Sequence, residues 1–203
     1  EKLIDYYFGE GGSMEVPESE LLSKYEESYA RFKYLVFYTK DTSGNSYTLE
    51  QQNAVYAKAQ EAYAKLQAGE SIETLIPQYS EDYKSYPENA TDAQKKQLDQ
   101  QNAEMVEDGV IADKNGVFNK EVYDYYGYKL DSTLISKIFE LQQGEYAFVE
   151  LSDSFWIVQK YSATEKENYF ADKKTDVFDE ITADDIQNLY NEWREAFPHE
   201  FNE

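Results

Sequence analysis

The stretch DSTLISKIFELQQGEYAFVELSDSFWIVQKY, residues 131–161, predicts the fold more clearly than any other part of the sequence. It opens with Asp131, a residue type that often caps the N-terminus of a helix. Apolar residues follow at helical spacing, namely Leu134, Ile135, Ile138 and Leu141. Gly144 stands after the last of them, where a residue in the left-handed conformation would end the helix. We therefore expect one short amphipathic helix that ends near Gly144.

Two strands are predicted directly after this helix. Residues 146–151 and 155–161 are rich in aromatic and β-branched side chains, which are typical of strands. Between them, residues 152–154 are Ser, Asp and Ser, which favour turns. The two strands should therefore form a hairpin.

This run of helix, Gly-Glu pair, strand, turn and strand resembles the C-terminal half of a parvulin-type peptidyl-prolyl isomerase domain. The residues that carry the resemblance are Phe139, Leu141, Gly144, Glu145 and the Trp-Ile-Val run at 156–158. The resemblance extends upstream to about Arg31, and both of the family's histidines are replaced. It implies an α+β fold with a four-stranded antiparallel sheet and covering helices over residues 31–162, between helical segments 1–30 and 163–203.

Upstream residues follow the family's order of elements. Residues 31–39 alternate between two faces, as a strand does, with Phe32, Tyr34, Val36 and Tyr38 on one face and Lys33, Leu35, Phe37 and Thr39 on the other. Helices are predicted over 49–66 and, capped by Ser71, over 72–79. A polar insertion with one helix is expected at 85–112, with a capping box of Thr91 and Gln94. Residues 116–118 match the family's short second strand. We expect 31–39 to pair with 155–161 within one antiparallel sheet.

The two terminal segments both carry apolar stripes. In residues 1–30 the stripe is formed by Leu21, Leu22, Tyr25 and Tyr29, and the resemblance makes this segment the tail of a chaperone region. In the C-terminal segment it is formed by Ile186, Leu189, Tyr190, Trp193 and Phe197, after a predicted capping box of Thr182 and Asp185. Stripes this wide are seldom left in water, so the segments should pack together or on the sheet.

Composition narrows the classes of function. The chain has 203 residues and a formal net charge of −22, which argues against binding nucleic acid or an anionic membrane surface. It has no cysteine and one histidine, so thiolate metal sites, disulfides and a histidine-based metal site are not predicted, and no cofactor is expected. The resemblance implies an extracytoplasmic location at a bacterial cell surface, with a lipid anchor outside this sequence as the means of membrane attachment.

The resemblance also places the candidate site. A prolyl isomerase lowers a rotation barrier of roughly 18–20 kcal/mol about the amide bond. The family does so with two histidines, a nearby Asp or Cys and an apolar proline pocket. At the histidine positions this sequence has Tyr34 and Trp156, and at the acidic position it has Asp82. Tyr34 and Asp82 are thus the candidate catalytic pair. The candidate substrate-binding residues are Leu130, Leu134, Trp156 and Phe118.

Three functions stay open from the sequence. The first is a foldase-like protein that binds extended or partly unfolded polypeptide, with or without proline, and whose isomerase activity is weak or lost. The second is an active prolyl isomerase in which Asp82 and Tyr34 suffice. The third is a surface protein without enzymatic activity that binds glycan or a protein partner through its many tyrosines. Coplanar exposed rings would favour glycan, whereas aliphatic side chains at the base of a groove would favour peptide.

Overall fold

The computed structural model describes residues 2–9 and 11–196 of the chain. Internal contacts divide the chain into two compact units. Residues Tyr29–Ser162 form one, here called the sheet unit, and Glu1–Ser28 with Ala163–Glu203 form the other, here called the terminal unit.

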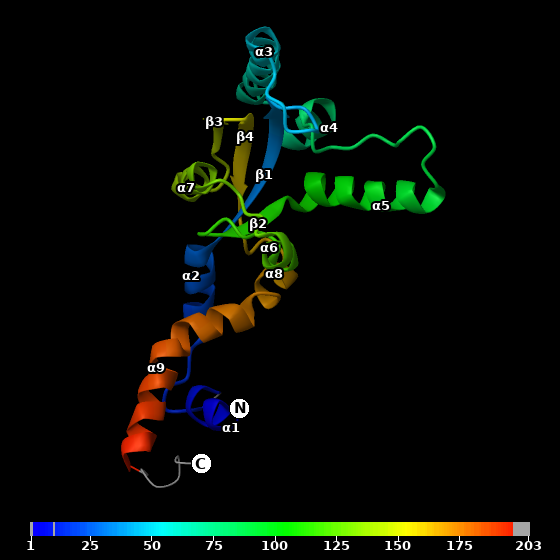
Figure 1. Cartoon of the computed structure of the whole chain (residues 1–203). Helices are drawn as coiled ribbons and strands as arrows, with labels where there is room; N and C mark the ends of the chain where they lie inside the picture. The colour runs from blue at the N-terminus through cyan, green and yellow to red at the C-terminus, as the bar shows by residue number, and fades with distance from the viewer. Residues whose placement is uncertain (1, 10, 197–203) are drawn as a thin grey trace. The chain divides into compact units, whose positions relative to one another are not determined.

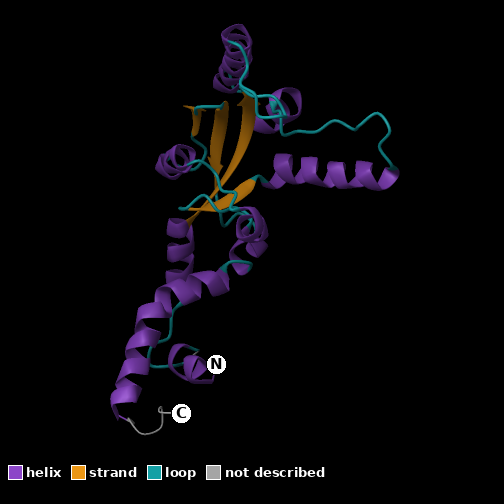
Figure 2. Ribbon diagram, in the orientation of Figure 1, coloured by secondary structure: helices purple, strands orange, loops and turns teal. Residues whose placement is uncertain are grey.

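The sheet unit is built on four strands, β1 (Tyr29–Tyr38), β2 (Val110–Asp113), β3 (Tyr146–Glu150) and β4 (Ser154–Tyr161). They form one antiparallel sheet in the order β2-β1-β4-β3, visible in Figures 1 and 2. The pairing of β1 with β4 runs from Arg31 opposite Tyr161 to Tyr38 opposite Ser154. The predicted α+β class, the single sheet and the neighbouring positions of 31–39 and 155–161 are confirmed.

The second strand lies earlier than predicted. It is β2, which pairs with the start of β1, and not residues 116–118. The reason is a turn after Asp113, whose side chain accepts hydrogen bonds from the N–H groups of Asn115 and Val117. Gly116 completes this turn with a φ of +84°. The insertion therefore ends before β2, and not at residue 112.

Two helices cover one face of the sheet. They are α3 (Leu49–Gln67), which begins with a capping box of Thr48 and Gln51, and α4 (Ile72–Tyr79), which is capped by Ser71 as predicted. Their side chains form a core with the alternate residues of the strands that point to this face. Its fully or largely buried members are Leu35, Phe37, Ile157, Ala59, Ala62, Leu66, Ile72, Leu75 and Ile76.

The opposite face is covered by α7 (Ser132–Glu140), which Asp131 caps as predicted. Leu134, Ile135 and Ile138 pack on strand residues such as Phe32 and Val158. Gly144 is not the residue that ends this helix, because the helix already ends at Glu140. Gly144 lies in the following turn with a φ of +86°, and its N–H donates to the carbonyl oxygen of Lys160 at 2.8 Å.

The remaining elements of the sheet unit lie between α4 and α7. They are α5 (Asp92–Ala103), the π-helix η1 (Glu104–Asp108) and α6 (Lys120–Tyr126). The capping box of Thr91 and Gln94 is present at the start of α5, and no residue of α5 is buried. This agrees with a polar surface insertion that adds little to the core.

The terminal unit contains α1 (Lys2–Phe8), α2 (Glu18–Ser28), α8 (Glu167–Ala171) and α9 (Lys174–Ala196). Leu21 and Tyr25 of α2 are buried, and α2 packs on α9. Thr182 does not cap a helix, because α9 runs through it and its hydroxyl donates to the carbonyl oxygen of Phe178 at 2.8 Å. Phe197, expected in the apolar stripe, lies outside the described residues.

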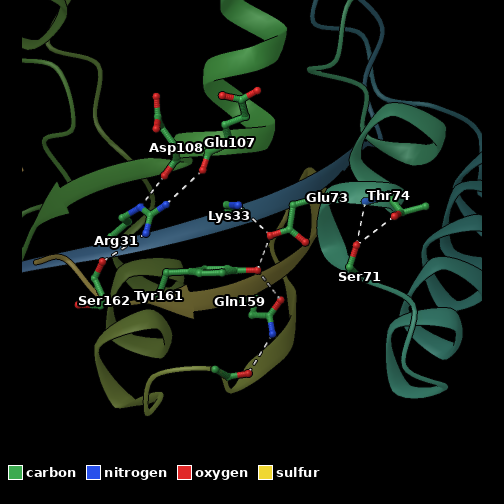
Figure 3. Close-up of polar contacts among 11 residues, drawn as sticks. Arg31, Lys33, Ser71, Glu73, Thr74, Glu107, Asp108, Gln159, Tyr161 and Ser162 are labelled. Atoms are coloured by element: carbon green, nitrogen blue, oxygen red, sulfur yellow. Dashed lines mark hydrogen bonds and ion pairs between the residues drawn. The ribbon is translucent and has the colours of Figure 1, made fainter. Parts of the chain in front are cut away.

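A partly buried polar network joins β1, β4 and α4 (Figure 3). The Lys33 ammonium lies 2.7 Å from a Glu73 carboxylate oxygen, and the same oxygen accepts a hydrogen bond from the Tyr161 hydroxyl at 2.7 Å. Burial alone would raise the pKa of Glu73, but the hydrogen bonds from Lys33 and Tyr161 lower it to about 2. Glu73 is therefore charged at neutral pH and ties α4 to the sheet.

Replacing Glu73 by glutamine is expected to remove a pH-dependent part of the stability. Because the folded pKa is lowered, the stabilisation is complete above the unfolded value of about 4.3 and is lost as the pH falls toward 2. Since about a third of the side chain is exposed, we expect roughly 1–2 kcal/mol rather than the full value of the shift.

The measurement is denaturant unfolding of both proteins between neutral pH and acid. The stability difference should be present at pH 7 and shrink below pH 4. Glu70→Gln is the matched control, because Glu70 pairs with Lys65 at 3.7 Å on the surface and should change little. A difference between Glu73→Gln and the unmodified protein that is independent of pH would contradict the expectation.

Candidate binding cavity

A cavity of about 300 Å³ lies on the α7-side face of the sheet, beside β2. It is lined by Phe32, Tyr34, Tyr38, Asp82, Val110, Phe118, Tyr128, Leu130 and Trp156. Six of these nine side chains are aromatic and one is charged. The volume is at the lower end of the range for small-ligand sites, so it suits one apolar side chain better than a large ligand.

Asp82 is held in place by the segment that follows α4. The Ser80 hydroxyl accepts a hydrogen bond from the N–H of Val36 at 3.2 Å, and the N–H of Glu81 donates to the carbonyl oxygen of Val36 at 3.0 Å. These two bonds fix residues 80–81 against the middle of β1. The next residue, Asp82, is thereby placed over the tyrosines of that strand.

The Asp82 carboxylate accepts a hydrogen bond from each of two phenols. Tyr34 donates to Oδ2 and Tyr38 donates to Oδ1, each at 3.0 Å. Burial, reinforced by the charge of Asp82 and its hydrogen bonds, raises the pKa of both hydroxyls well above the usual value for tyrosine. Both phenols are therefore neutral at physiological pH, with their protons directed at Asp82.

Trp156 forms the inner wall of the cavity and is 6% exposed. Its ring centroid lies 4.9 Å from that of Tyr34. Its indole N–H donates to the Ser154 hydroxyl at 3.0 Å, so it is already used within the fold. Trp156 contributes apolar surface to the cavity rather than a donor for a ligand.

The rim of the cavity is aromatic and exposed. Phe118 and Tyr128 lie with ring centroids 5.8 Å apart and planes at 88°, and they are 37% and 51% exposed. This pair is not coplanar, so Phe118 and Tyr128 do not form the flat aromatic platform that would favour glycan.

Five of the six predicted site residues meet in this cavity: Tyr34, Asp82, Phe118, Leu130 and Trp156. Leu134 does not line the cavity, because its side chain is fully buried between α7 and the sheet. The sequence interpretation missed the other four lining residues, Phe32, Tyr38, Val110 and Tyr128. Tyr38 had a usable signal, since it lies two residues after Tyr34 on the same face of the strand. Tyr128 lies in a loop, where no sequence pattern indicated that it would reach the cavity.

Replacing Asp82 by asparagine is expected to lower the pKa of both Tyr34 and Tyr38. The negative charge that disfavours phenolate would be lost, but burial is the largest cause of the shift, so both values should stay above about 10. The measurement is a pH titration followed by NMR with ¹³C-labelled tyrosine rings. Asp99→Asn is the control, because Asp99 accepts from the exposed Tyr86 instead. Unchanged values for Tyr34 and Tyr38 in Asp82→Asn would contradict this account.

No group of three or more acidic, histidine or cysteine side chains within 2–9 and 11–196 is arranged to hold a metal ion. None of the helices in that part of the chain combines the length and the apolar character needed to cross a bilayer.

Comparison with known proteins does not assign the chain to a family. No protein-family model matches the chain, and no curated protein matches it. Among solved structures it is similar to one titled "Crystal Structure of PrsA from Bacillus subtilis", with 18% sequence identity and a TM-score of 0.39. The match covers 85% of this chain and 51% of that one, so the chain spans about half the length of that structure. A likeness at this level does not assign the chain to a family.

Proposed function

We propose that the sheet unit binds extended or partly unfolded polypeptide at the Asp82 cavity, as a foldase-like protein related to prolyl isomerases whose own isomerase activity is weak or lost. The observation that carries the proposal is a largely aromatic cavity in which the Tyr34, Tyr38 and Trp156 donors are already hydrogen-bonded within the fold. Such a cavity accepts an apolar side chain but presents few groups that act on an amide.

Binding would use the walls of the cavity. Val110, Leu130 and Trp156 offer apolar side chains for a proline ring or another compact side chain. Phe118 and Tyr128 at the rim would contact the neighbouring residues of the bound chain. The negative charge of Asp82 and the overall charge of −22 favour polypeptides with basic residues.

Catalysis of isomerisation requires contacts that are stronger in the twisted amide than in either planar form. Tyr34 and Tyr38 donate to Asp82, and Trp156 donates to Ser154. To act on a substrate, each donor would first have to break its internal hydrogen bond. Binding without such differential stabilisation holds an unfolded chain and does not speed its isomerisation.

One contact favours the second candidate, an active isomerase. Tyr34 and Asp82 are hydrogen-bonded, as an isomerase that relies on this pair would require. The two candidates differ in whether replacing Asp82 abolishes turnover or only alters binding.

Location belongs to the same proposal. An extracytoplasmic foldase at the bacterial cell surface would meet newly exported, unfolded chains, and a lipid anchor outside this sequence would keep it at the membrane. Fractionation of cells that express the complete natural protein tests this part.

The proposal is tested by three assays on one sample: aggregation, binding and isomerisation. Reduced and alkylated ribonuclease A serves as the unfolded basic chain in the binding assay. The protein should slow the aggregation of a heat-denatured test protein and bind labelled ribonuclease chains. It should accelerate the isomerisation of a proline tetrapeptide only slightly. Tyr128→Ala should weaken both holding effects. Tyr86→Ala is the matched control, because Tyr86 is also 51% exposed but lies away from the cavity.

Two results would overturn the proposal. Rapid isomerisation that Asp82→Ala abolishes would make the protein an enzyme. Binding that is equally strong in Tyr128→Ala and in the unmodified protein would place the client away from the cavity.

A further inference from the structure

We propose that the free edge of β3 is a second polypeptide-binding site, which takes an extended basic segment as an additional strand of the sheet. This inference rests on the proposed function only for the class of ligand, an unfolded polypeptide. The residues and the contacts are different, because β3 lies at the edge of the sheet opposite β2 and the cavity.

The register of the ladder shows which backbone groups of β3 are available. Lys160 N–H donates to the carbonyl oxygen of Glu145, and Leu151 N–H donates to that of Ser154, each at 2.9 Å. Since hydrogen-bonded positions alternate along an antiparallel pair, residues 147 and 149 face β4, and residues 146, 148 and 150 face away from it. In the part of the chain that the structure describes, no hydrogen bond occupies these outward backbone groups.

A groove of about 520 Å³ runs beside this edge. Tyr63 of α3 bounds it on one face of the sheet, and Lys137 and Leu141 bound it on the other. The Tyr63 ring centroid lies 5.9 Å from that of Tyr146 and 5.5 Å from that of Phe148. An added strand would place alternate side chains against these rings and against Leu141.

The edge lacks the features that usually prevent pairing. Natural edge strands often carry proline, lysine or a bulge, whereas β3 reads Tyr-Ala-Phe-Val-Glu and has none of the three. The turn before β3 is also fixed, because the Gln159 side chain donates to the carbonyl oxygen of Gly144 at 3.0 Å and is linked through Tyr161 to Glu73 (Figure 3). The start of β3 is therefore held in place before any partner binds.

Charge and size identify the occupant as a basic segment of another polypeptide rather than a second copy of this chain. Glu145 and Glu150 are exposed at the two ends of β3, and each copy carries a net charge of −22. Five paired residues span only about 17 Å. A stable dimer usually needs about 20–30 residues from each side.

The test uses a short fluorescein-labelled peptide of alternating valine and lysine, followed by fluorescence anisotropy. A twin peptide with every backbone amide N-methylated keeps the side chains and the charge but cannot pair as a strand. We expect the unmodified peptide to bind and the N-methylated twin to bind roughly tenfold or more weakly. Equal binding of both peptides would overturn the proposal without any change to the protein.

Two variants of Phe148 locate the site. Phe148→Pro removes an outward N–H that the ladder does not use, and edge strands tolerate proline at such positions. Phe148→Ala removes the same ring but keeps the N–H. Binding should fall further in Phe148→Pro than in Phe148→Ala, with similar circular dichroism spectra for the two variants. Similar binding by the two variants would overturn the proposal.

Amide hydrogen exchange separates the two sites. The peptide should protect the amides of residues 146 and 148, and Tyr128→Ala should leave this protection intact. Weaker ribonuclease binding in Tyr128→Ala with intact protection at β3 supports both proposals. Protection that is absent at β3 while ribonuclease still binds in a Tyr128-dependent manner refutes the edge site alone. Protection at β3 without any Tyr128 dependence refutes the cavity alone.

Discussion

Replacing Leu134 by alanine is expected to lower the free energy of unfolding by about 2–5 kcal/mol. The side chain is fully buried between α7 and the sheet, where Phe32 and Val158 belong to the same core. Its removal would leave a cavity that the neighbouring strands cannot close. The measurement is denaturant unfolding followed by circular dichroism.

The same variant separates stability from binding. Leu134 does not line the Asp82 cavity, so binding of unfolded polypeptide per folded molecule should be unchanged. Leu130→Ala is the comparison variant. Because Leu130 lines the cavity, this substitution should weaken binding. A Leu134→Ala protein that melts like the unmodified chain but fails to bind would show that the sequence interpretation of Leu134 was right and the structural account wrong.

Replacing Arg31 by methionine is expected to cost about 3–5 kcal/mol of stability. The guanidinium is 1% exposed and donates to the carbonyl oxygens of Asp108, Glu107 and Ser162 at 2.6, 3.2 and 3.3 Å (Figure 3). Without it, these acceptors at the ends of η1 and β4 lose a buried donor. Equilibrium unfolding of the variant gives the loss directly.

Arg31→Lys is the informative control. An ammonium retains the charge but cannot place several donors in one plane, so most of the loss should remain. If Arg31→Lys is as stable as the unmodified protein, charge alone accounts for the effect and the fork geometry is irrelevant.

The strands and helices with strong patterns were predictable from the sequence. The alternation in residues 31–39 placed Tyr34 and Val36 on one face and Leu35 on the other, as the cores show. Side-chain caps such as Asp131 mark helix starts through local hydrogen bonds, which are readable without tertiary contacts. These features depend on neighbours along the chain.

Features set by distant contacts were not predictable. β2 has four residues, and its pairing with β1 rather than its own pattern makes it a strand. Leu134 and Leu130 look alike in sequence and both are buried, and only the tertiary structure shows that Leu130 lines the cavity and Leu134 does not. The burial of Arg31 depends on three carbonyl groups that are 76, 77 and 131 residues away.

NMR mapping of bound polypeptide shows whether the Asp82 cavity is the binding site. Protein with labelled valine and leucine methyl groups is titrated with reduced and alkylated ribonuclease A. We expect the methyl signals of Val110 and Leu130 to shift with increasing ligand, and those of Leu75, which is buried on the opposite face of the sheet, to stay constant. Saturation of binding with no change at Val110 and Leu130 would contradict the account, because the polypeptide would then occupy a site other than the Asp82 cavity.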